Sequence, residues 1–196
     1  MILAPELVRT TEIVAALAGA AYVVLAARRN RLCWLAGAFS AALVGALSVV
    51  NALPMQGALN AYYVAMSVYG YLNWSRASQS GELPVGTLAW RWHASAAAII
   101  VPLSWLTAEV LARETHAAWP LLDSLTTWFS LFATWMAARA RIENWIYWIL
   151  IDGVLVYLYY KQGMPVLALQ FAAMTGLAMA GLVAWRRKLH SQAAPA

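Results

Sequence analysis

Long apolar runs alternate with short clusters of basic or turn-forming residues along most of this chain. Seven runs have about the 20 residues that cross a bilayer as a helix. They cover about 10–27, 32–53, 56–74, 92–111, 120–138, 143–161 and 165–185. The pattern predicts an all-α membrane protein whose seven transmembrane helices form a single transmembrane transporter domain over residues 1–196.

Two stretches between or after these runs are predicted to be non-helical. The Ser-, Gly- and Pro-containing stretch 75–87 is predicted to be a polar loop that separates two halves of the chain. The basic residues Arg186, Arg187 and Lys188 are predicted to end the last helix.

The third run has a polar face. Gln56, Asn60, Tyr63, Ser67 and Gly70 recur at helical spacing and therefore share one side of the predicted helix. Because this side is too polar for lipid, we expect it to face other helices.

The sixth run carries a carboxylate near its middle. Trp145, Trp148 and Asp152 lie at i, i+3 and i+7 on one stripe, which Tyr159 continues. A charge at membrane depth costs at least ~2.5–3.5 kcal/mol, so such a residue usually faces a protein interior or a wet cavity. Asp152 either ties helices together by hydrogen bonds or helps to form a pocket for a flat, cationic, ring-bearing solute.

Further candidates lie on the fifth and seventh runs. Trp128 lies beside a face that carries hydroxyl side chains, and Gln170 is an amide within the seventh run. Amide side chains can donate to and accept from the hydroxyl groups of a solute, or can join two helices. For Gln56, close to a helix end, we favour the joining role. Trp145, near the start of its run, could alternatively be an anchor at the membrane surface.

Composition agrees with a membrane protein. Hydrophobic residues make up 63% of the chain and charged residues 11%, with a mean hydropathy of +0.64. The net charge of +5 is explained by the placing of the basic residues, so no nucleic-acid partner is expected. The single cysteine, Cys33, is expected to pack among apolar residues, and no cleavable signal peptide is predicted.

The basic residues predict an orientation. With the N-terminus outside, ten of the thirteen Lys and Arg residues fall on cytoplasmic segments, as the positive-inside rule favours. These are Arg28, Arg29, Arg31, Arg76, Arg91, Arg139, Arg141, Arg186, Arg187 and Lys188. We therefore predict a multi-pass protein of a bacterial inner membrane, with its C-terminus in the cytoplasm.

An internal repeat underlies the run pattern. A shift of 111 positions superposes Ala26-Ala27-Arg28 on Ala137-Ala138-Arg139, Trp34 on Trp145, Gly70 on Gly181 and Trp74 on Trp185. Two parallel three-helix repeats, at about 10–74 and 120–186, would then be joined by a linker helix at about 92–111. Transporters built in this way bind their substrate at the repeat interface.

Together, the motifs YGYLNW (69–74), WIYWILID followed by LYYK (145–161), and the close on Gly181 and Trp185 resemble the Pnu family of vitamin transporters. The likeness covers nearly the whole chain and is strongest to the PnuC type, which carries nicotinamide riboside. It implies a 3+1+3 fold similar to SWEET transporters, a homotrimer, and facilitated diffusion followed by trapping through a cytoplasmic vitamin kinase. Trp145, Trp148 and Asp152 fall on the family's substrate-binding motif.

Two departures from the family pattern leave the vitamin open. Asn60 stands where relatives usually have Gln, and Tyr71 where they have Trp. Nicotinamide riboside is favoured, with thiamine, also a cationic ring, as the alternative. An accessory membrane subunit is the other class considered. No nucleophile-and-base set, metal motif or Walker loop occurs, so neither an enzyme nor a cofactor is expected.

Overall fold

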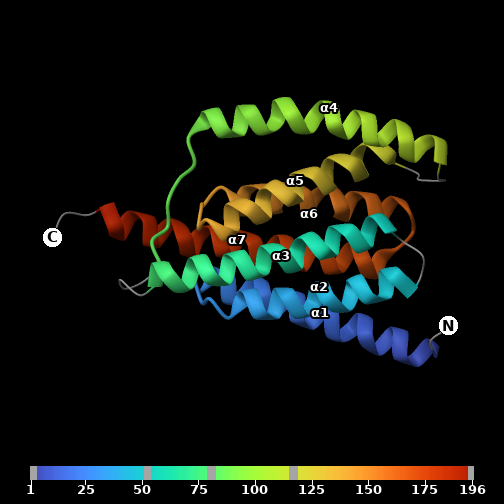
Figure 1. The fold of residues 1–196 in the computed structure, drawn as a ribbon, viewed down its shortest axis with the longest axis horizontal. Helices are drawn as coiled ribbons and strands as arrows, with labels where there is room; N and C mark the ends of the chain where they lie inside the picture. Colours follow the sequence, from blue (N-terminus) through green and yellow to red (C-terminus); the bar gives the residue numbers. More distant parts are fainter. Residues whose placement is uncertain (1–3, 51–53, 79–82, 115–118, 194–196) are drawn as a thin grey trace.

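Seven helices run roughly along one direction in the computed structural model, which describes residues 4–50, 54–78, 83–114 and 119–193 (Figure 1). They are α1 (Pro5–Ala27), α2 (Cys33–Val50), α3 (Pro54–Ser78), α4 (Trp90–Glu114), α5 (Pro120–Ala138), α6 (Asn144–Lys161) and α7 (Pro165–Ala193). The all-helical prediction is therefore confirmed, with each helix on one of the seven predicted runs.

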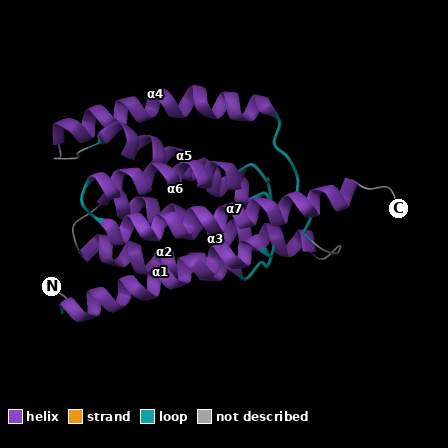
Figure 2. Cartoon of the chain, turned by 180° about the vertical axis from the view of Figure 1, so that it is seen from behind, coloured by secondary structure: helices purple, strands orange, loops and turns teal. Residues whose placement is uncertain are grey.

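Six of the helices form a closed ring. α1 contacts α2 and α7, α2 contacts α3, α3 contacts α5, α5 contacts α6, and α6 contacts α7. The fourth helix, α4, lies outside this ring against α5, and Figures 1 and 2 show it separated from the rest of the bundle. The ring thus places residues from both halves of the chain around a common interior.

Hydropathy divides the helices in an informative way. α1, α2, α4 and α7 are long and apolar enough to cross a membrane by length and composition. α3, α5 and α6 are not among them, and these three helices hold most of the buried polar side chains of the described residues. These are Asn60 and Ser67 on α3, Ser124, Thr126, Ser130 and Thr134 on α5, and Asn144 and Asp152 on α6.

Two predicted helix limits are wrong. α3 continues past Trp74 to Ser78, into the stretch predicted to be a loop, and α7 continues past Arg186, Arg187 and Lys188 to Ala193. Basic residues end an apolar run, but they are good helix formers and do not end a helix. The extension carries α7 beyond the other helices (Figure 1).

The turns between α1 and α2 and between α5 and α6 have the same geometry. Arg29 and Ala140, which are 111 positions apart, have positive φ angles of 57° and 53°. The Arg29 amide donates to the Ala26 carbonyl and the Ala140 amide to the Ala137 carbonyl, both at 2.9 Å. Both turns lie at the end of the bundle that also contains the end of α7, here called the C-terminal end.

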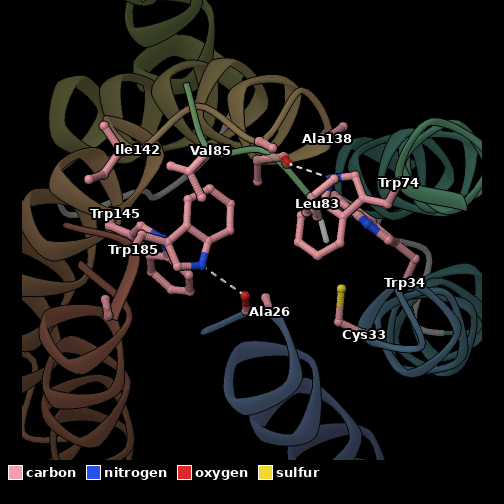
Figure 3. Packing of buried hydrophobic residues seen from close by; sticks show 13 residues of the cluster. Ala26, Cys33, Trp34, Trp74, Leu83, Val85, Ala138, Ile142, Trp145 and Trp185 are labelled. Carbon is pink, nitrogen blue, oxygen red and sulfur yellow. Dashed lines mark hydrogen bonds between the residues drawn. The ribbon is translucent and has the colours of Figure 1, made fainter. Parts of the chain in front are cut away.

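Four tryptophans fill the interior at this end (Figure 3). In this indole cluster, the rings of Trp34 and Trp74 meet edge to face at 5.4 Å, and those of Trp145 and Trp185 at 5.5 Å. The rings of Trp74 and Trp185 lie 5.9 Å apart and so join the two pairs. Cys33 is fully buried in the same cluster, which confirms the expected packing role.

The cluster also has matched hydrogen bonds and matched glycines. Trp74 donates from Nε1 to the Ala137 carbonyl at 3.2 Å, and Trp185 donates to the Ala26 carbonyl at 3.0 Å (Figure 3). A Cβ on Gly70 would collide with the ring of Trp34, and one on Gly181 would collide with the ring of Trp145. Glycine is therefore required where each helix crosses its indole.

The connection from α3 to α4 packs into the core. Residues 83–87 are non-helical, as predicted for the loop, and residues 79–82 of that prediction lie outside the described residues. Leu83 and Val85 are buried in the indole cluster (Figure 3), so this connection is not the simple polar one that was expected. We call residues 83–89 the strap. Its backbone pairs with the α5–α6 turn, because the Gly86 amide donates to the Ala140 carbonyl and the Ile142 amide to the Gly86 carbonyl, both at 3.0 Å.

Side chains hold the strap as well. The Leu88 amide donates to Glu143 Oε1 at 2.9 Å, and Arg141 Nη1 donates to the Thr87 carbonyl at 3.0 Å. On the α7 extension, Gln192 Oε1 accepts from the Val85 amide at 3.2 Å. The C-terminal end of the ring is therefore closed both by indoles and by the strap.

Candidate functional site

Two adjoining cavities lie inside the ring, next to the indole cluster. The first has a volume of about 210 Å³ and the second about 230 Å³. Gly19, Tyr22 and Trp148 line both, so the two cavities meet at these residues. Ligand pockets usually measure roughly 300–1,000 Å³, so neither cavity alone reaches that range.

The first cavity brings together aromatic rings and a carboxylate. Trp148 and Asp152 enter it from α6, and Gln170, Phe171 and Met174 enter from α7. Asp152 is buried, with 6% of its surface exposed. Trp148 and Asp152 are one helical turn apart, so the stripe seen in the sequence does face the interior of the ring.

The second cavity is lined by small and polar side chains. Asn60, Tyr63 and Ser67 come from α3, and Thr134 from α5. Tyr63 Oη lies 2.7 Å from Ser130 Oγ, which fixes the phenol across the α3–α5 contact. Three members of the polar face predicted for the third run, Asn60, Tyr63 and Ser67, thus face the interior of the ring, whereas Gln56 is exposed and lines a separate cavity outside the ring.

Several hydrogen-bonding groups at these cavities have unused capacity. Asn60 Nδ2 donates to the Gln56 carbonyl at 2.8 Å, and a side-chain amide has a second N–H and an oxygen besides. The Nε1 atoms of Trp34 and Trp145 are buried and have no partner within the described part of the chain. Trp34 lines the second cavity and Trp145 the first, so each cavity has beside it an indole whose N–H is unpaired among the described residues.

The two cavities occupy equivalent places under the 111-residue shift. Trp148 and Asp152 in the first cavity correspond to Gly37 and Ala41 in the second. Conversely, Asn60, Tyr63 and Ser67 in the second cavity correspond to Phe171, Met174 and Ala178 in the first. The same positions therefore form an aromatic, acidic cavity on one side and a small, hydroxyl- and amide-lined cavity on the other.

The charge of the lining is one-sided. None of the described residues that line the two cavities is Lys, Arg or His, whereas Asp152 contributes a carboxylate. Among the described residues no group of three His, Cys, Asp or Glu side chains could hold a metal ion. The interior is thus suited to a cation or a neutral solute, and a phosphate would find no opposite charge there.

Six of the eight sequence candidates line the two cavities. These are Trp145, Trp148, Asp152 and Gln170 in the first, and Asn60, Tyr63 and again Trp148 in the second. Trp145 is only 3% exposed and its ring is packed against Trp185, so it belongs to the indole cluster as well as to the lining.

The other two candidates lie elsewhere. Trp128 lines a separate cavity outside the ring, where its Nε1 donates to Thr107 Oγ1 at 3.1 Å. Tyr159 lines neither of the two cavities but stacks on Phe171, with ring centroids 5.3 Å apart and planes at 9°. It therefore supports the wall of the first cavity from behind.

Sequence reasoning missed Tyr22, Phe171 and Met174. Tyr22 lines both cavities from the middle of α1, and its ring meets that of Trp34 edge to face at 5.5 Å. None of the three belongs to a polar stripe, so periodicity gave no signal. The shift by 111 positions could have found Phe171 and Met174, because they are the counterparts of Asn60 and Tyr63.

Known proteins with similar sequences and folds are transporters. The model of a family described as "Nicotinamide mononucleotide transporter" matches residues 9–187. The nicotinamide riboside transporters PnuC of Escherichia coli (strain K12) and of Shigella flexneri are each 24% identical over 154 residues, which is 65% of this chain. The aligned segment spans 64% of the length of these relatives, which is less than two thirds.

A solved structure shares the fold. The crystal structure of the vitamin B3 transporter PnuC matches with a TM-score of 0.72 over 92% of this chain and 82% of that one, at 22% identity. At this identity the match concerns the arrangement of the helices, and the chemistry has to be argued from the residues that line the cavities.

Proposed function

We propose that this chain, which belongs to the nicotinamide mononucleotide transporter family, carries a cationic, ring-bearing vitamin across the membrane, with nicotinamide riboside as its cargo. The observation that most supports this proposal is the pair of unlike cavities inside one ring. One offers indoles and a buried carboxylate, and the other offers amide and hydroxyl groups. A positively charged ring joined to a sugar needs both.

The first cavity is the proposed place for the charged ring. A cation over an indole face gains roughly 0.5–2 kcal/mol, depending on how well water is excluded. Trp148 supplies such a face, and Asp152, one turn away, supplies the opposite charge. Phe171, backed by Tyr159, closes the cavity on the α7 side.

The second cavity is the proposed place for the sugar. Ribose hydroxyls both donate and accept, so they fit Asn60, Tyr63 and Ser67 better than the apolar wall of the first cavity. Gln170 would reach the ring's carboxamide or a hydroxyl from the first cavity. The unpartnered Nε1 atoms of Trp34 and Trp145 are further donors for oxygens of the vitamin.

The cargo is proposed to enter without a phosphate. The family description names a mononucleotide, but a phosphate would lie in a lining that contains a carboxylate and, among the described residues, no basic side chain. Burying an unpaired phosphate would cost several kcal/mol. Nicotinamide riboside avoids that cost, and phosphorylation by a cytoplasmic kinase would then prevent its return.

The proposed architecture is a 3+1+3 arrangement in a single domain. α1–α3 and α5–α7 are parallel repeats (about 10–74 and 120–186), and α4 is the linker helix. Support comes from the matched turns, indole pairs and glycines 111 positions apart. All seven helices would cross the bilayer, since the buried polar side chains of α3, α5 and α6 are sheltered from lipid by neighbouring helices, either inside the ring or between α5 and α4.

The proposed orientation has the N-terminus outside and the C-terminus in the cytoplasm of an inner-membrane protein. The ten basic residues counted above belong to helix ends or connections at the C-terminal end, which the positive-inside rule would place on the cytoplasmic side. A homotrimer is part of the proposal through family membership alone.

The C-terminal end would then hold the inner gate. The indole cluster and the strap pack together at this end and would block the route from the cavities to the cytoplasm. Release of the vitamin requires the two repeats to separate there, which breaks the strap's bonds to the α5–α6 turn and to Gln192. Transport down a gradient needs no further energy source than the vitamin's own concentration difference.

A binding titration with three vitamins tests the proposal. The purified full chain should bind nicotinamide riboside most tightly, thiamine more weakly, and the neutral, larger riboflavin least. Tight thiamine binding with no nicotinamide riboside binding would move the assignment to a thiamine transporter. Binding of none of the three would favour the accessory-subunit class and overturn the proposal.

A further inference from the structure

A third cavity lies outside the ring, at the opposite end of the bundle from the indole cluster. It has a volume of about 270 Å³ and is enclosed by the start of α3, the later part of α4 and the first half of α5. We call it the side cavity. Its polar and aromatic lining comprises Gln56, Tyr62, Thr107, Asp123, Ser124, Thr127 and Trp128.

Both aromatic rings of the side cavity are fixed. Trp128 Nε1 donates to Thr107 Oγ1 on α4 at 3.1 Å, and Tyr62 Oη donates to the Leu131 carbonyl at 2.9 Å. Because the polar atoms of both rings are engaged at their edges, what remains for a ligand is the π faces. A face held in this way suits a cation better than a hydrogen-bonding solute.

A buried polar group at this cavity lacks a partner. Ser124 is 2% exposed, and its Oγ has no hydrogen-bond partner in the part of the chain that the structure describes. Buried hydroxyls are nearly always satisfied, so an orphaned one that lines a cavity calls for an explanation. Asp123, in the first turn of α5, adds a carboxylate, and the described lining includes no basic residue.

The side cavity therefore repeats the chemistry of the ring interior. It combines an indole, a carboxylate and a side-chain amide in Trp128, Asp123 and Gln56, as the ring does in Trp148, Asp152 and Gln170. Tyr62 and Tyr63, adjacent on α3, turn to the two sides of the α3–α5 contact, with ring centroids 6.0 Å apart. One helix wall thus separates the two sites.

We propose that the side cavity is a second binding site, for an organic cation held by Asp123 and the faces of Trp128 and Tyr62. The proposal rests on the proposed function only for the choice of vitamin as one source of the cation. The other source with the same chemistry is the ammonium headgroup of a phospholipid, since the side cavity lies between α4 and the ring.

The test uses the purified full chain labelled with 5-fluorotryptophan, with the Trp128 resonance assigned from Trp128→Phe. Nicotinamide riboside is titrated into the parent and into Trp148→Ala, which disables the ring site. We expect a saturable shift of the Trp128 resonance in both proteins. If the Trp128 shift is retained and Trp148→Ala binds as many molecules of vitamin as the parent, the vitamin does not occupy the ring; this result would sink the proposed function and leave the side cavity standing.

Two variants examine the carboxylate. Asp123→Asn should weaken the affinity seen at Trp128 by about fivefold or more, as expected for losing an opposite charge near a cation. Glu109→Gln is the matched control, because Glu109 is exposed on α4, pairs with Arg113 and does not line the cavity. It should leave the affinity unchanged.

A lipid arm separates the two sources. The same resonance is followed in nanodiscs of phosphatidylglycerol with and without phosphatidylethanolamine. A shift that requires ethanolamine lipid, is lost in Asp123→Asn and excludes the vitamin would assign the cation to the headgroup. If neither nicotinamide riboside nor ethanolamine lipid gives a shift that depends on Asp123, the site does not exist.

Discussion

The indole cluster and the two ring cavities lie next to each other, but they differ in how similar their residues are to those 111 positions away. In the cluster the corresponding tryptophans are identical, Trp34 with Trp145 and Trp74 with Trp185, and the contacts within each pair are nearly identical too. In the cavities the corresponding residues differ, as with Asp152 and Ala41. Where the two repeats make the same packing contacts, the same residues occur in both. A pocket for an unsymmetrical solute instead needs different residues on its two sides.

The largest expected effect is on the packing side of this comparison. Gly181→Ala forces a Cβ to within 2.6 Å of the Trp145 ring, and Gly70→Ala does the same against Trp34. Both should lower the free energy of unfolding by roughly 1–3 kcal/mol, since a closely packed core gives way only by strain. The measurement is the melting temperature of the purified protein. The control is Gly153→Ala, whose Cβ would meet nothing within 4 Å, and equal stability of all three variants would refute the account of the cluster.

The next effect is on the cavity side. Asp152→Asn keeps the shape of the side chain and removes its charge, so the affinity for nicotinamide riboside should fall by about tenfold, or on the order of 1–2 kcal/mol. Binding of nicotinamide, which has a neutral ring, should change little. Titration calorimetry on both ligands measures this. If expression collapsed while the affinity of the surviving protein stayed at the parent level, Asp152 would be joining helices and not binding solute.

A smaller effect is expected where the strap closes the cluster. Glu143→Gln replaces a charge-assisted bond to the Leu88 amide by a neutral one, a loss of about 1 kcal/mol. The C-terminal end should then open about fivefold more often. Cys33, the one cysteine of the chain and buried in the indole cluster, reports this as faster alkylation by a small maleimide. An unchanged rate would mean that the strap does not close the route.

The smallest effect compares the two halves of the cluster directly. Trp74→Phe and Trp185→Phe each remove one indole N–H that donates to a backbone carbonyl, which should cost about 0.5–1.5 kcal/mol in addition to the loss of ring volume that the two variants share. Because the two bonds are equivalent, the two losses in melting temperature should agree. A large loss in one variant and none in the other would be evidence against paired repeats.

Helices and inward faces could be predicted because they depend on local patterns. The stripe with Trp148 and Asp152 and the face with Asn60 and Tyr63 follow from helical spacing alone. Only four of the described helices are apolar enough to be recognised as membrane spans from hydropathy alone. The other three are recognised from the spacing of their polar residues, which share one face of each helix.

What could not be predicted depends on which helices become neighbours. Trp128 and Trp148 are both tryptophans within predicted transmembrane helices, but the α3–α5 contact places Trp128 outside the ring. Leu83 and Val85 lie in a stretch of turn-forming residues, and only the fold reveals that they are buried beneath the indoles. Periodicity describes one helix at a time and contains no information on such contacts.

The most direct measurement of the central claim is the affinity of Trp148 variants for nicotinamide riboside. Stacking on an aromatic side chain is worth roughly 1–3 kcal/mol by alanine substitution in other systems. Trp148→Ala should therefore lose at least about tenfold in affinity, and Trp148→Phe should retain part of the binding because it keeps a ring face. Trp105→Ala, on the exposed side of α4, is the control and should bind like the parent. If Trp148→Ala binds and transports nicotinamide riboside as the parent does, the vitamin does not occupy the ring cavities.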